Sequence, residues 1–103
     1  MRLEYYPLEK LKQEILVILG KHLDVSQYRV FFFGSRVAGK GTDRSDIDVG
    51  IEGPEPIQFE ILEDIKEELE RLPMLYKIDI VDFKNLTAKF REVARQHIEM
   101  LSP

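Results

Sequence analysis

The chain has 103 residues, of which 44% are hydrophobic and 33% are charged, and its formal net charge is −4. This length and apolar fraction fit one folded domain, expected over residues 1–103, while the negative charge argues against general nucleic-acid binding. The absence of cysteine excludes disulfides, thiolate metal ligands and cysteine catalysis. No apolar run reaches the roughly 18 residues of a membrane span and no signal peptide is recognisable, so we expect a cytoplasmic protein that does not bind membranes.

The first part of the chain predicts a helix and then a buried strand. Between about residues 7 and 22, apolar residues recur at steps of three and four, the spacing of an amphipathic helix. The stretch "YRVFFFG", residues 28–34, is rich in aromatic and β-branched residues and indicates a strand that stops at Gly34. A short helix is expected to begin near Ser35.

The rest of the chain predicts two more strands and two more helices. "DIDVGIEG", residues 46–53, alternates in polarity and indicates a strand, which "GPEP" then ends. A helix is expected over residues 57–72, and "YKIDIVDF", residues 76–83, is a third strand. A last helix should be capped by Asn85 and carry apolar residues as far as Leu101. This order predicts an α+β (α/β) fold, a small sheet with helices packed on one face.

Two aspartates stand one residue apart in the second predicted strand. Because alternate residues of a strand share a face, Asp46 and Asp48 should project side by side from the face opposite to the core. Like charges at this spacing repel each other, and a divalent cation removes the repulsion. Oxygen ligands without histidine or cysteine favour Mg²⁺, with Mn²⁺ as the other choice.

The third predicted strand offers one more carboxylate to this face. Asp82 has the same parity as the apolar Ile78 and Ile80, whereas Asp79 has the opposite parity. Asp79 is therefore the expected third ligand, provided that the two strands are neighbours. Three carboxylates on adjacent strands can hold two metal ions about 4 Å apart, an arrangement used for in-line phosphoryl displacement.

The Gly-Ser turn after the first strand predicts a phosphate site. Backbone N–H groups where a strand passes into a helix bind phosphate oxygens, and Gly34 would allow a close approach. The hydroxyl of Ser35 adds a donor, and Arg36, Lys40 and Arg44 are cations that would neutralise a triphosphate. Taken singly, a Gly-Ser is usually only a turn and an Asp-x-Asp is often solvated. The combination in order indicates a catalytic site.

With these residues in view, "GSRVAGKGTDRSDIDVGI" resembles the signature of the DNA polymerase β-like nucleotidyltransferase superfamily, and more narrowly the minimal nucleotidyltransferases (MNT proteins). "KIDIVDF" resembles the strand that carries the third aspartate there. The resemblance implies a mixed, palm-like sheet and transfer of a nucleoside monophosphate from a nucleoside triphosphate, ATP by analogy, to a hydroxyl. It assigns Gly34 and Ser35 to the β- and γ-phosphates, Asp46 and Asp48 to both metal ions, and Asp79 to the metal site that activates the acceptor.

The chain departs from the family pattern at one point. Many relatives have Gly-Ser-x-Ala-Arg-Gly, whereas here Val37 stands at the usual alanine and Ala38 at the usual arginine. The departure removes a cation beside the phosphates, for which Arg36, Lys40 or Arg44 would have to compensate.

The chain carries no recognisable acceptor site, so a partner protein or a second copy of the chain would have to supply it. Proteins that this one resembles are commonly paired with a HEPN-domain toxin, and some silence it by adenylylating a tyrosine. The leading hypothesis is an antitoxin that acts as a protein adenylyltransferase. Two alternatives stay open: a non-catalytic nucleotide-sensing module that masks its partner, and a nucleotidyltransferase with a small-molecule acceptor such as an aminoglycoside.

Overall fold

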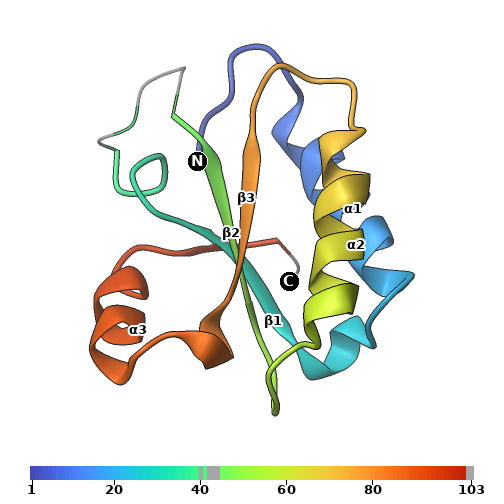
Figure 1. Ribbon diagram of the computed structural model, residues 1–103. Coiled ribbons are helices and arrows are strands. Elements are labelled where there is room, and N and C mark those ends of the chain that lie inside the picture. Colours follow the sequence, from blue (N-terminus) through green and yellow to red (C-terminus); the bar gives the residue numbers. More distant parts are fainter. Residues whose placement is uncertain (40, 42–44, 102–103) are drawn as a thin grey trace.

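The computed structural model describes residues 1–39, 41 and 45–101. Lys40 and Arg44, two of the predicted phosphate ligands, lie outside the described residues. Figure 1 shows the elements in chain order: α1 (Leu8–Gly20), η1 (Val25–Gln27), β1 (Arg29–Phe33), β2 (Ile47–Glu52), α2 (Phe59–Glu70), β3 (Ile78–Asp82), η2 (Phe83–Asn85), α3 (Ala88–Ala94) and β4 (Glu99–Met100). The three longer predicted helices and the three predicted strands form in the predicted order, within two residues of the predicted ends except for the last helix.

The sheet is mixed, with the strand order β3-β2-β1-β4. β1 pairs antiparallel with both β2 and β4, whereas β2 and β3 are parallel. Parallel neighbours need a crossover connection, and α2 provides it between β2 and β3. The two strands with the predicted aspartates are therefore neighbours.

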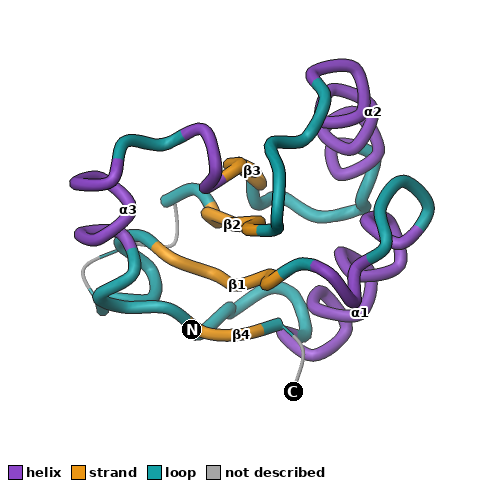
Figure 2. Tube along the Cα trace, turned by 90° about the horizontal axis from the view of Figure 1, so that it is seen from below, coloured by secondary structure: helices purple, strands orange, loops and turns teal. Residues whose placement is uncertain are grey.

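The two long helices cover one face of the sheet, as predicted (Figure 2). The apolar stripe of α1 packs with Ile65 and Leu69 of α2 on the inward residues of the strands, such as Phe32 and Val49. These residues alternate with the side chains of the other face, so the period-two pattern of β1 and β2 decides which face is covered. This cluster is the main core.

The third helix differs from the predicted arrangement because it lies on the other side of the sheet (Figure 2). Phe31 and Phe33 point to this second face, and Phe83, directly after β3, packs edge-to-face on them with ring centroids 4.8 and 5.0 Å away. Gly50 makes room for this cluster, since a Cβ there would lie 2.5 Å from the Phe31 ring. The fold class is confirmed, and the second face is partly covered by the aromatic cluster and α3.

The end of the chain also differs from the prediction. The last helix is short and is capped by Thr87, whose hydroxyl accepts from the N–H of Phe90 at 3.2 Å, while Asn85 belongs to η2. Ile98 and Leu101 lie beyond the helix, around β4, a two-residue strand too short to be recognised from its sequence pattern.

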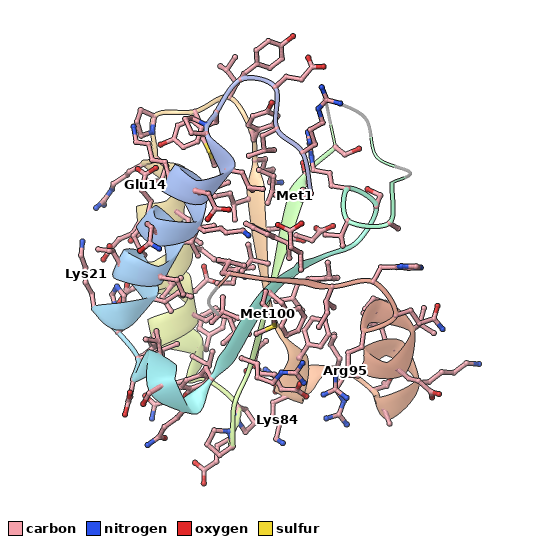
Figure 3. All side chains as sticks on the ribbon, turned by 180° about the vertical axis from the view of Figure 1, so that it is seen from behind. Met1, Glu14, Lys21, Lys84, Arg95 and Met100 are labelled. Atoms are coloured by element: carbon pink, nitrogen blue, oxygen red, sulfur yellow. The ribbon has the colours of Figure 1, made fainter. Side chains whose placement is uncertain are left out.

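An ion pair between Arg95, the residue after α3, and Glu52 of β2 ties the third helix to the sheet. Figure 3 shows Arg95 on the opposite side of the molecule from Lys21 of α1. Within the described part of the chain, no helix is long and apolar enough to cross a membrane.

Candidate active site

β2 and β3 lie side by side (Figure 1), and Asp48 and Asp79 are register partners in this parallel pair. Residues paired in this way project from the same face, and this face is the one opposite to α1 and α2. Asp79 is exposed and Asp48 is half-buried. The condition set from the sequence, that the two strands be neighbours, is met.

Asp82 has a structural role that separates it from Asp79. Its side chain is buried, with 5% exposed, and its carboxylate accepts hydrogen bonds from the N–H of Ile57 at 2.8 Å and of Lys84 at 3.0 Å. The side-chain amide of Asn85 donates a third, at 3.3 Å. Asp82 therefore fastens the segment before α2 to the end of β3, on the core side of the sheet.

Asp46 was predicted to be the first residue of the strand, but β2 begins one residue later, at Ile47. Asp46 is exposed. It is still close enough to act on its neighbours. The pKa of Asp48 is raised from 3.8 to about 6, first by burial and then by the negative charges of Asp79 and Asp46. The three predicted carboxylates thus share one electrostatic environment.

The donor set fits an oxygen-liganded divalent cation. As the side chains are placed, no three His, Cys, Asp or Glu residues among those described lie close enough to hold a metal ion. Asp46 and Asp79 are exposed, however, so their side chains have room to adopt other rotamers. The pKa of Asp48 is raised by burial and by two negative neighbours, a repulsion that Mg²⁺ or Mn²⁺ would relieve.

The Gly-Ser turn closes directly over Asp48. Gly34 has φ of +82°, which favours glycine, and a Cβ there would lie 2.2 Å from Oδ2 of Asp48. The predicted short helix at Ser35 does not form. A single helical turn, with Ala38 N–H donating to Gly34 O at 3.1 Å, ends at Gly39 with φ of +78°. Glycine at position 34 is what lets the turn and the carboxylate meet.

Arg36 holds the loop that leads to the aspartates. Its Nε donates to the carbonyl oxygen of Ser45 at 2.8 Å, and its guanidinium lies 4.8 Å from the ring centroid of Tyr76. The Tyr76 hydroxyl in turn accepts from the backbone N–H groups of Glu4 and Tyr5. Sequence reasoning missed the contact between Tyr76 and Arg36, because no local pattern signals a contact across 40 positions. The contact of Arg36 with phosphate stays a prediction.

Over residues 13–102 the chain matches the family described as "Polymerase beta, Nucleotidyltransferase". A match over this share of the chain establishes membership: the chain belongs to this nucleotidyltransferase family. The family and the enzyme class expected from the sequence are confirmed.

Three similarities to individual proteins agree with this family. The chain is 34% identical over 88 residues to a "Probable protein adenylyltransferase MntA" of Haemophilus influenzae, a match that covers 84% of this chain and 77% of that protein. It is 27% identical to a solved minimal nucleotidyltransferase, with a TM-score of 0.66 over 91% of this chain and 95% of that one. A chain in the complex of the tri-AMPylated Shewanella oneidensis HEPN toxin with an MNT antitoxin shares the fold, with 15% identity, a TM-score of 0.59 and coverage of 90% and 71%.

Proposed function

We propose that the protein transfers AMP from ATP to a tyrosine hydroxyl of a HEPN-domain toxin and so acts as its antitoxin. The observation that carries the proposal is the meeting of two features at one end of the sheet. The paired carboxylates of Asp48 and Asp79 lie on one face, and the Gly34 turn closes onto Asp48. Carboxylates beside a phosphate-binding turn are what transfer from a nucleoside triphosphate requires.

Some residues of the site bind the phosphates, and others bind the metal ions. Gly34 and Ser35 bind the β- and γ-phosphates through the turn, and Arg36, the next residue of the same turn, is the proposed phosphate-binding cation. Two Mg²⁺ ions, or Mn²⁺ in their place, are the proposed cofactor. They would be held by Asp46, Asp48 and Asp79, and when bound they supply positive charge to the phosphate oxygens and the attacking oxygen.

In the proposed reaction the acceptor hydroxyl oxygen attacks the α-phosphorus of ATP. A new oxygen–phosphorus bond forms as the bond to the oxygen that bridges the α- and β-phosphates breaks. Pyrophosphate leaves with that electron pair, held at the Gly34–Ser35 turn, and the hydroxyl proton passes to a carboxylate oxygen of Asp79. The exposure of Asp79 leaves it accessible to an incoming tyrosine.

The protein acceptor is supported by the named relatives. One is described as a protein adenylyltransferase, and another is a chain with the same fold in a complex of an AMPylated HEPN toxin with an MNT antitoxin. The described elements form one sheet, the two long helices α1 and α2 that cover one of its faces, and α3. A partner protein would supply the acceptor tyrosine.

The test uses ATP labelled at the α-phosphate, Mg²⁺ and a HEPN-domain protein encoded beside this chain. We expect label on a tyrosine of the partner, lost in Asp48→Asn and retained in Asp64→Asn, a matched exposed aspartate on α2. Labelling that survives in Asp48→Asn would exclude the proposed site.

A second function is favoured by one feature of the sequence, Ala38, at a position where the resemblance to the superfamily signature leads us to expect arginine. With one cation fewer beside the phosphates, the chain would bind nucleotide and mask its partner without transfer. A tight complex with the HEPN-domain protein, with bound nucleotide but no label on either chain, would support this function over transfer.

A further inference from the structure

A cavity of about 320 Å³ lies between the Gly34–Ser35 turn and α3. Gly34, Ser35 and Ala38 line it on one side, and Phe90 and Val93 line it on the other. Its volume falls within the range of pockets that hold small organic ligands, about 300 to 1,000 Å³. The cavity therefore continues the proposed phosphate site onto an apolar wall.

The wall that α3 contributes is apolar on a helix that is otherwise charged. Phe90 is 55% exposed and Val93 is 59% exposed, although both are large hydrophobic side chains. Four other positions near them carry charge: Lys89, Arg91, Glu92 and Arg95. An exposed aromatic side chain beside a phosphate site is suited to stack on the planar group of a bound ligand.

Ala38 makes the opposite wall of the cavity small and apolar. The family pattern has arginine at this position, whose guanidinium would bring charge and bulk to the cavity. Alanine keeps this wall small and apolar. A larger or charged side chain at position 38 would fill this part of the cavity or make it polar, whereas alanine leaves an apolar space next to the turn.

We propose that this cavity holds the purine base of the nucleoside triphosphate, with Phe90 and Val93 as base-contacting residues. The inference rests on the proposed function, because the phosphates must sit on the Gly34–Ser35 turn for the base to reach α3. A purine presents a larger face to Phe90 than a pyrimidine does, so the pocket favours ATP over CTP.

Polar side chains at the rim are placed to contact the edge of such a base. Gln96 and His97, which follow α3, are among the residues that line the cavity. A glutamine side-chain amide offers a donor and an acceptor, the pair that matches the N6 and N7 positions of adenine. The contribution of the base to affinity therefore comes from residues 90–97, outside the catalytic carboxylates and the turn.

The test is a calorimetric titration with three probes in the presence of Mg²⁺: α,β-methylene ATP, α,β-methylene CTP and inorganic tripolyphosphate. The methylene group prevents transfer, so binding is measured without turnover. We expect the unaltered protein to bind the ATP analogue more tightly than the CTP analogue and tripolyphosphate. Phe90→Ala should weaken the ATP analogue about tenfold and leave tripolyphosphate unchanged.

Phe59→Ala is the matched control, since Phe59 is 70% exposed on α2 and does not line the cavity. It should alter none of the three affinities. A second matched pair is Val93→Ser and Val17→Ser, with 59% and 61% exposure, and only the first should weaken the ATP analogue. Val17 lies on α1, on the far side of the sheet from α3 (Figure 2).

The outcomes separate this inference from the proposed function. Two outcomes would overturn the base pocket alone. The first is equal affinity of the unaltered protein for tripolyphosphate and both analogues. The second is a Phe90→Ala protein whose affinity for tripolyphosphate falls as much as its affinity for the ATP analogue. Failure to bind any of the three probes would overturn both.

Discussion

Asp48 of β2 stands directly opposite Asp79 of β3 in a parallel pair, with Gly34 closing against the Asp48 carboxylate. Two like charges are thereby held on adjacent strands, and one of them is half-buried. Such an arrangement destabilises the folded chain until a cation binds. The cost of assembling the site should therefore be measurable in the unfolding free energy.

Asp48→Asn should stabilise the metal-free protein at neutral pH. Burial and the neighbouring carboxylates raise the pKa of Asp48 from 3.8 to about 6, so the folded state binds its proton more tightly than the unfolded state. Stability from this group therefore falls as the pH rises from about 4 to 6, and the loss is complete above that range. At about pH 7.5, after allowance for solvent screening, we expect a gain of about 1 to 2 kcal/mol in Asp48→Asn.

The measurement is urea unfolding in a chelator at about pH 7.5 and again at about pH 4, where the difference should shrink toward zero. Asp64→Asn, at an exposed position of α2, serves as the control and should show no such dependence. A variant at position 48 that is less stable than the unaltered protein at about pH 7.5 would contradict the proposed repulsion.

Magnesium should stabilise the unaltered protein much more than it stabilises Asp48→Asn. A cation that binds only the folded state adds about 1.4 kcal/mol at ten times its Kd, which a thermal unfolding scan resolves as a rise in Tm. Asp48→Asn removes the carboxylate that lies between Asp46 and Asp79 in sequence order and should show a much smaller rise. An equal rise in Tm in both proteins would mean that the magnesium ion binds at another site.

Gly34→Ala should slow transfer about a hundredfold without unfolding the chain. Alanine disfavours the φ of +82° at this position, and its Cβ would lie 2.2 Å from Oδ2 of Asp48, so the turn or the carboxylate must move. A displacement of about 1 Å in such a site costs roughly a hundredfold in rate. Gly39→Ala is the control, because it has a similar φ of +78° but nothing within 4 Å of the added Cβ. If the transfer rates of the two variants fall equally, backbone strain alone, and not the contact with Asp48, would explain the loss.

The strands that position the site could be predicted from local sequence patterns. The alternation of Ile47 and Val49 with Asp48 decided which face of β2 is buried, and the parity of Asp79 against Ile80 distinguished it from Asp82 before any partner strand was known. Both arguments need only the two-residue period of a strand and one apolar face.

The features that sequence reasoning missed depend on contacts between distant parts of the chain. Phe83 draws the end of β3 over Phe31 and Phe33, so α3 follows onto the second face rather than joining α1 and α2. β4 is held by pairing with β1 and has only two residues, too few for a recognisable pattern. The turn at Ser35 resembles a helix start in sequence, but Gly39 ends it after one turn.

The two aspartates of β3 should respond in opposite ways to the same substitution. Asp82 is buried and its carboxylate accepts three hydrogen bonds, two of them from the N–H groups of Ile57 and Lys84. In Asp82→Asn one carboxylate oxygen becomes an NH₂ donor, so at least one N–H group loses its acceptor, at a cost of about 2 to 3 kcal/mol. The variant should keep its transfer activity at temperatures where it is folded, because Asp82 faces away from the site.

Asp79→Asn removes a negative charge beside Asp48, so the unfolding free energy should hold or rise while transfer is lost. Urea unfolding and transfer of the labelled nucleotide, measured on both variants, therefore give a crossed result: one loses stability and the other loses activity. Loss of activity in a folded Asp82→Asn, with full activity in Asp79→Asn, would reverse the assignment of the two carboxylates. The site would then have to lie on the covered face of the sheet, where α1 and α2 leave no access for a nucleotide.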